Sequence, residues 1–219
     1  MKRYFSGFLK PPRLYGFLLI VVMIMASSAP GKGQRWEVTP YGGYLFAGKV
    51  RGNEGELIIE NSRTLGLALS YAMDEGSSIE LSYLGASSTS MVAQFGAPES
   101  ESTSFEMAIE YFQLNFVEEM STSGKIVPMG FLSIGATSFR PRELDFDREW
   151  FYTLGLGAGT KMQLSENIGL RAQGRLAVPL FLSAGKSWCD ESNDVCLIQL
   201  FSFNAIPLID LGLGIFFRF

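Results

Sequence analysis

The closing stretch IDLGLGIFFRF (residues 209–219) decides the fold of this chain, because its residues alternate between two unlike kinds. One set is apolar and comprises Ile209, Leu211, Leu213, Ile215, Phe217 and Phe219. The other set is mixed and comprises Asp210, Gly212, Gly214, Phe216 and Arg218. Successive side chains of a β-strand point to opposite faces, so this period of two predicts a strand with one apolar face.

Seven earlier windows show the same alternation. They are RWEVTPYGGYLFAG (35–48), TLGLALSYAM (64–73), SIELSYLGA (78–86), FEMAIEYFQLNFVEEM (105–120), VPMGFLSIGATSF (127–139), FYTLGLGAGTKMQL (151–164) and IGLRAQGRLAVPLFL (168–182). The connections alternate in length: residues 74–77, 119–124 and 165–167 are short, whereas 48–62, 87–104, 140–149 and 184–204 are long. Eight strands connected in this way predict an antiparallel up-and-down arrangement with the four long loops at one end.

One window breaks the alternation. In FEMAIEYFQLNFVEEM the apolar residues from Met107 to Tyr111 have odd numbers, and those from Phe112 to Phe116 have even numbers. An extra residue inserted into a strand pair shifts the following side chains by one position. We therefore expect a β-bulge near Tyr111, which would restore a single apolar face.

The two faces of the strands indicate the kind of barrel. One face carries Leu, Ile, Phe, Met and Tyr, and the other carries Gly, Ala, Ser and Thr with a few charges. A soluble lipid-carrying barrel needs dense charge outside, but only 18% of this chain is charged, against roughly 25% in a typical soluble domain. A membrane barrel turns its apolar face to lipid and its polar face inward. The sequence therefore predicts an all-β, eight-stranded antiparallel up-and-down transmembrane β-barrel.

A lumen charge network is expected on the small-residue face. Its members are Glu80, Glu110, Lys161, Arg171, Arg175 and Asp210. Charges removed from water are tolerable only when they are paired, so we expect the three acids to pair with the three bases. The small residues around them suit the narrow interior of an eight-stranded barrel.

The N-terminal segment has the composition of an export signal. Four basic residues between Lys2 and Arg13 precede the apolar run LYGFLLIVVMIMA (14–26) and a group of small residues. This order predicts a secretory signal peptide over residues 1–29, cleaved between 26 and 33, followed by an outer-membrane β-barrel domain over residues 30–219; the alternative is an uncleaved membrane anchor. Cleavage would leave 14 basic minus 22 acidic residues, a balance of −8. Such an acidic chain is not expected to bind nucleic acid.

The two cysteines both lie in the polar segment SWCDESNDVC (187–196). In the oxidising compartment that an export signal implies, Cys189 and Cys196 are expected to form a disulfide that closes this loop. The alternative is a metal site that adds Asp190, Glu191 and Asp194 to the two thiols. Two cysteines without histidine make a poor zinc ligand set, so the disulfide is favoured.

Catalytic chemistry finds little support in the sequence. The chain has no histidine, which removes the commonest general base, proton shuttle and metal ligand. The carboxylates Glu118 and Glu119 adjoin a predicted turn, a position that indicates solvated surface. The glycine-rich GLGAGT (155–160) lacks the Lys-Ser/Thr of a phosphate-binding loop. We therefore expect no catalytic residues, no cofactor and no metal site, and predict that the chain is not an enzyme.

Three segments resemble the small outer-membrane β-barrel family of the OmpA/OmpX type: WEVTPYGGYLFAG (36–48), GLGAGTKM (155–162) and GLGIFFRF (212–219). The terminal phenylalanine is similar to the end of the C-terminal signal read by the barrel-assembly machinery, which here would comprise Leu213, Ile215, Phe217 and Phe219. The resemblance implies a bacterial outer-membrane location, contact with outer-membrane lipid and lipopolysaccharide, and the barrel-assembly machinery as a partner during biogenesis. Barrel enzymes of this size, such as lipid A deacylases, depend on an active-site histidine, which this chain lacks.

The four long loops are the best candidates for function, because binding residues concentrate on the loops of a rigid scaffold. We expect a non-enzymatic outer-membrane barrel with a structural or surface-interaction role through these loops. Two alternatives stay open: a narrow pore or transport barrel for small or hydrophobic solutes, and a soluble periplasmic lipid-binding barrel. Acidic residues such as Glu54, Glu56 and Glu60 make the loop end a hydrated rim, or a site for cations or an envelope protein partner.

Overall fold

The computed structural model describes residues 35–51, 55–94, 103–120, 124–142, 148–181, 185–190, 195–200 and 204–219. Residues Arg35–Arg218 form one compact unit. The predicted signal peptide over residues 1–29 and its cleavage site between 26 and 33 lie outside the described residues. Within the described ranges, no helix is long and apolar enough to cross a membrane.

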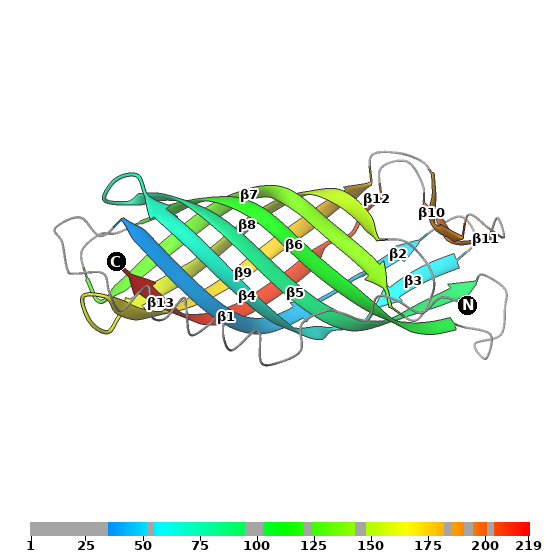
Figure 1. Cartoon of the computed structure of the whole chain (residues 1–219), viewed down its shortest axis with the longest axis horizontal. Helices are drawn as coiled ribbons and strands as arrows, with labels where there is room; N and C mark the ends of the chain where they lie inside the picture. Colours follow the sequence, from blue (N-terminus) through cyan, green and yellow to red (C-terminus); the bar gives the residue numbers. More distant parts are fainter. Residues whose placement is uncertain are drawn as a thin grey trace, which may run out of the picture. The chain divides into compact units, whose positions relative to one another are not determined.

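Eight long strands close into a barrel (Figure 1). They are β1 (Trp36–Phe46), β4 (Ser62–Ala72), β5 (Ser77–Gln94), β6 (Thr103–Glu119), β7 (Ile126–Pro141), β8 (Glu149–Gln163), β9 (Ile168–Phe181) and β13 (Leu208–Arg218). Each pairs antiparallel with its neighbours, β1 pairs with β13, and the β5–β6 pairing completes the ring. The predicted fold class is therefore confirmed.

Five shorter strands lie in the connections of the described chain. They are β2 (Lys49–Arg51), β3 (Gly55–Ile59), β10 (Gly185–Asp190), β11 (Val195–Leu200) and β12 (Asn204–Ala205). β2 and β3 extend the sheet beside β5, β12 pairs with β9, and β10 and β11 form a separate two-stranded sheet. The segments 48–62 and 184–204 were expected to be loops, but both are partly strand.

The strands β5 and β6 also continue further than expected. Their pairing runs from Ser77 opposite Glu118 to Val92 opposite Thr103, inside the segment 87–104 that was assigned to a loop. This part of β5 carries serine at its buried positions, including Ser88 and Ser90, so it lacks the apolar periodicity on which the prediction depended. Backbone hydrogen bonds to the neighbouring strand hold it in the sheet instead.

Three short turns join β4 to β5, β6 to β7 and β8 to β9 at one end of the barrel, the left end in Figure 1. In the first turn Asp74 Oδ1 accepts hydrogen bonds from the backbone N–H of Gly76, at 3.0 Å, and of Ser77, at 2.8 Å. In the second, Gly124 has a φ of 129°, which only glycine adopts easily. We call this the short-turn end and the opposite one the long-loop end.

The predicted bulge near Tyr111 is wrong. β6 pairs with β5 and with β7 in an unbroken register over its full described length. Met107, Ile109 and Tyr111 therefore point into the lumen, whereas Phe112 points outward. The change of phase in the sequence reflects an apolar lumen at the long-loop end, not an inserted residue.

The apolar part of the lumen is a tightly packed cluster that we call the apolar plug. Its buried members include Leu45, Leu57, Ile59, Leu84, Phe105, Met107, Ile109, Tyr111, Phe139, Ile206 and Leu208. They come from β1, β3, β5, β6, β7, the start of β13 and the residue Ile206 between β12 and β13, all near the long-loop end. The plug fills this half of the barrel interior.

The outward face is apolar in the middle of the barrel. Leu65 is 75% exposed, Leu213 71% and Leu132 66%. Soluble monomers rarely present so continuous an apolar surface to water, whereas a transmembrane barrel presents it to lipid.

Candidate functional site

The centre of the lumen holds a buried ion pair between Arg171 on β9 and Glu80 on β5. Arg171 Nη2 donates to Glu80 Oε1 at 3.1 Å, and Nη1 donates to Oε2. Glu80 also accepts from Ser70 Oγ at 2.8 Å and from Asn115 Nδ2 at 2.9 Å. Because Glu80 accepts hydrogen bonds from residues of three other strands, β4, β6 and β9, this group ties four strands together across the lumen.

A second charged group lies nearer the short-turn end. Lys161 Nζ lies 2.8 Å from Glu37 Oε1 and 2.9 Å from Glu119 Oε1. Arg218 Nη2 lies 3.0 Å from Glu37 Oε2. Glu37 and Arg218 are also register partners on β1 and β13, the strands nearest the two ends of the described chain. The group therefore fastens the seam where the barrel closes.

Arg175 and Asp210 form a third polar group next to the apolar plug. They are register neighbours on β9 and β13, but the contacts that bind them are with neutral residues. Arg175 Nη1 donates to Gln113 Oε1 at 2.6 Å, and Asp210 Oδ2 accepts from Thr64 Oγ1 at 2.9 Å. The guanidinium of Arg175 lies 5.4 Å from the ring centroid of Phe131.

Glu110 was expected in the lumen network, and this placement is wrong. It lies on the outward face of β6, where Arg148 Nη1 is 2.8 Å from Oε2. Tyr83 Oη donates to its Oε1 at 3.1 Å, and Ser138 Oγ to its Oε2 at 3.3 Å. The reason is the unbroken register of β6: without a bulge, even-numbered residues of this strand face outward.

Two lumen carboxylates, Glu37 and Glu119, were missed from the sequence. Glu37 shares its parity with the buried Thr39 and Tyr41, so the alternation could have found it. Glu119 was assigned to solvated surface because it adjoins a turn, yet it binds Lys161 inside the barrel mouth. Its neighbour Glu118 is exposed, as expected of a turn-flanking residue.

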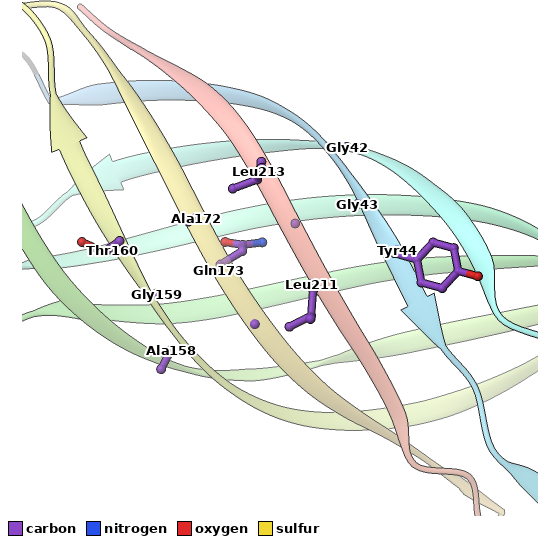
Figure 2. Close-up of a pocket in the computed structure, with 12 residues that line it drawn as sticks. Gly42, Gly43, Tyr44, Ala158, Gly159, Thr160, Ala172, Gln173, Leu211 and Leu213 are labelled. Atoms are coloured by element: carbon purple, nitrogen blue, oxygen red, sulfur yellow. The ribbon is translucent and has the colours of Figure 1, made fainter.

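An open groove of about 640 Å³ lies on β1, β13, β9 and β8 (Figure 2). Small residues such as Gly42, Ala158 and Ala172 form its floor, and the exposed side chains of Leu211 and Leu213 border it. It contains no charged side chain. Among the residues that the structure describes, no group of three acidic or cysteine side chains is placed to hold a metal ion.

No protein-family model matches the sequence, and no curated protein matches it. Solved structures do resemble the barrel. The outer membrane protein OprG of Pseudomonas aeruginosa matches with a TM-score of 0.58 and 10% identity, over 85% of this chain and 97% of that one. The Neisserial surface protein A matches with a TM-score of 0.52 and 12% identity, over 84% and 97%. This chain has the fold of a small outer-membrane β-barrel.

The outer membrane protein AlkL, in a structure determined in lipid bilayers, is a third such barrel, with a TM-score of 0.51 and 12% identity over 88% of this chain and 94% of that one. At sequence identities this low, the structural similarity establishes the fold and nothing more. The predicted resemblance to small eight-stranded outer-membrane barrels is confirmed, and the predicted location in the bacterial outer membrane agrees with these structures.

The two cysteines of the predicted disulfide lie in the two-stranded sheet of β10 and β11, which is separate from the barrel sheet. Cys189 on β10 and Cys196 on β11 are direct register partners, so their backbones lie opposite each other. A bond between them stays a prediction. Glu191 and Asp194, members of the alternative metal set, lie outside the described residues, as does Glu54 of the acidic rim.

The expected assembly signal falls on β13. Leu213 and Ile215 point outward and are exposed, whereas Phe216 between the signal residues is buried inside the barrel. Phe217 and Phe219 are half-buried. The alternation that the resemblance required is present, and recognition by the assembly machinery stays a prediction.

Proposed function

We propose that this chain is a non-enzymatic outer-membrane barrel with a closed lumen that acts at the cell surface through its long-loop end. The observation that carries the proposal is the filling of the lumen. Three polar groups, centred on Lys161, Arg171 and Arg175, follow one another from the short-turn end, and the apolar plug occupies the remainder. An outer-membrane barrel has short periplasmic turns, so the plug would lie toward the outside of the cell.

The filled lumen argues against a pore. A hydrated ion would have to break the Glu80–Arg171 pair and then pass between plug side chains such as Met107, Ile109 and Phe139, which have no exposed surface. Moving an ion into such surroundings without its water is strongly unfavourable. We therefore expect no steady flux of small polar solutes.

A role at the cell surface is supported by the length of two strands. β5 has 18 residues and β6 has 17, whereas about 9–11 residues suffice to span a bilayer. With β3 and β2 paired beside β5, these strands form a sheet that continues beyond the membrane at the long-loop end. An exposed sheet of this kind offers a more rigid interaction surface than a loop does.

A swelling assay tests the closed lumen. Liposomes that contain the folded barrel should swell in an isotonic solution of a small sugar no faster than protein-free liposomes. Addition of protease to intact cells should cleave residues of the 94–103 segment. Rapid swelling would contradict the closed lumen, and protection of this segment on cells would contradict the orientation.

A second candidate is a carrier of hydrophobic solutes, and the apolar plug favours it. A lumen lined by Leu45, Ile109 and Phe139 would accept an apolar molecule if these side chains separated. The same liposomes, loaded with a fluorescent binding protein for a long-chain alcohol, would report its uptake. Uptake that depends on the barrel and falls in an Ile109→Gln variant would favour the carrier over the surface role.

A further inference from the structure

The middle of the lumen holds one positive and one negative charge that are not paired directly with each other. The other lumen carboxylates, Glu37, Glu80 and Glu119, each form an ion pair with a lysine or an arginine. Arg175 and Asp210 are both buried and are register partners on β9 and β13, yet no ion pair joins them within the described part of the chain. Buried charges without a direct partner are costly, so another polar group must compensate them.

Each of the two charged groups uses only part of its hydrogen-bonding capacity. Arg175 Nη1 donates to Gln113 Oε1 at 2.6 Å, whereas its Nε and Nη2 have no partner among the described residues. Asp210 Oδ2 accepts from Thr64 Oγ1 at 2.9 Å, whereas its Oδ1 has no partner there either. Nε and Nη2 lie on the same side of the planar guanidinium group, so they can donate to one ligand together. The two charges therefore offer donors on one side and an acceptor on the other.

Neutral side chains around the two charges also have unpartnered polar atoms. Because a guanidinium group only donates, Gln113 must present its oxygen to Arg175, and its amide nitrogen is left without a partner in the described chain. The same is true of the buried hydroxyl groups of Tyr41 and Tyr111 and of the amide oxygen of Gln173. Both charges interact electrostatically with the two tyrosine hydroxyl groups, so these atoms belong to one region of the lumen.

A glycine leaves room beside the carboxylate of Asp210. Gly212 is the next lumen-facing residue of β13, and a Cβ atom at this position would lie 3.7 Å from Asp210 Oδ1 and 3.5 Å from Cδ2 of Tyr41. These are ordinary van der Waals distances, so a group of the size of a methyl fits there. A water molecule is about as large as a methyl group. The site therefore has space for a small molecule in contact with the carboxylate.

The mixture of donors and acceptors determines which occupant fits. An anion would bind Arg175 but would be repelled by the carboxylate of Asp210, and a cation would be repelled by Arg175. A neutral molecule that both donates and accepts can bind the guanidinium group, the amides, the hydroxyl groups and the carboxylate at once. Buried water molecules do this in proteins and make about three hydrogen bonds each to polar groups that lack other partners. The polar atoms therefore favour water over an ion.

We propose that Arg175 and Asp210 form a water-bridged ion pair, in a chamber of ordered water molecules between the Glu80–Arg171 pair and the apolar plug. The bridging water keeps both groups charged although neither has a charged partner in contact. The lumen is then closed by two separate barriers, the ion pair and the plug, with water between them. This inference goes beyond the closed lumen and does not depend on the orientation of the barrel in a membrane. Its failure would leave the closed lumen, which solute flux tests, unaffected.

A crystal structure of the full chain that resolves ordered water, from crystals grown in sodium bromide, tests the inference on the unaltered protein. We expect water molecules at hydrogen-bond distance from Arg175 Nε and Nη2 and from Asp210 Oδ1, and no anomalous signal of bromide beside them. A bromide peak at Arg175 would identify an anion site instead. Direct contact between the guanidinium group and the carboxylate, or a site without water, would also overturn the proposal.

Two alanine variants supply a matched comparison. Gly212→Ala places a methyl group beside Asp210 Oδ1 and should displace the water molecule bound there. Gly42→Ala on β1 also makes only ordinary contacts, the nearest at 3.6 Å from the outward Leu65, and should leave the chamber unchanged. Solid-state NMR in lipid bilayers, with polarisation transferred from water to labelled aspartate carboxyl groups, should show loss of most of the Asp210 signal in Gly212→Ala alone. Equal Asp210 signals in the wild type and both variants would overturn the inference.

Discussion

Replacement of the central ion pair is the sharpest test of the lumen. Glu80 and Arg171 are 1% and 3% exposed, so neither charge has access to bulk water. Arg171→Gln leaves the Glu80 carboxylate with only Ser70 and Asn115 as hydrogen-bond partners. Removing one partner of a buried pair costs about 3–5 kcal/mol.

The double variant Glu80→Gln/Arg171→Gln should be less damaged than the two single variants suggest. Two neutral amides can bond to each other and to Ser70 and Asn115, so no uncompensated charge remains. We expect a coupling energy of about 2 kcal/mol between the two positions. Arg63→Gln, an exposed substitution, should change stability by less than about 0.5 kcal/mol.

Urea titration of the barrel in phospholipid vesicles measures these differences, with the mobility of unboiled samples on a gel reporting the folded fraction. At a slope of about 2 kcal/mol per molar urea, a 4 kcal/mol loss lowers the midpoint by about 2 M. Single-variant effects that simply add, with a coupling energy below about 0.5 kcal/mol, would refute the paired lumen.

Three further predictions concern the backbone, the hairpin and a turn. Gly135→Ala should prevent stable folding, because its Cβ would lie 2.0 Å from a backbone oxygen of β6, whereas Gly130→Ala on the same strand, with its nearest neighbour at 3.7 Å, should fold normally; heat-dependent gel mobility distinguishes them. Mass spectrometry of unreduced protein should find Cys189 linked to Cys196, and two alkylated thiols would disprove it. Two backbone N–H groups lower the pKa of Asp74, so Asp74→Ala should destabilise the barrel at neutral pH. That loss should shrink as the pH falls through the lowered pKa of the carboxyl, and a constant difference in urea midpoint across pH would argue against it.

The fold was predictable because lipid imposes a simple constraint. A strand that separates lipid from a filled lumen needs two unlike faces. In β13 these two faces are visible in the sequence as the alternation of Leu211 and Leu213 with Gly212 and Gly214. The ends of β5 and β6 were not predictable in the same way. Beyond the membrane neither face of a strand has to be apolar, so the pattern disappears although the hydrogen bonds continue.

The lumen was only partly predictable, because alternation assigns a residue to a face but does not identify which face is inside. Glu110 and Phe112 both have even numbers and lie on the same, outward face of β6. The prediction placed Glu110 inside because it assumed that every apolar residue, including Met107 and Ile109, faces lipid. Met107 and Ile109 violate that assumption because the plug is itself apolar. Partners such as Lys161 and Glu37 lie 124 positions apart, and only the closed ring brings them together.

The central claim is that the lumen is closed, and single-channel recording across a planar bilayer tests it most directly. The wild-type barrel, inserted with its fold verified by gel mobility, should give no reproducible conductance steps in molar salt. A variant with Met107, Ile109 and Arg171 all changed to glycine should open a path and give steps. Reproducible steps from the wild-type protein would contradict the account.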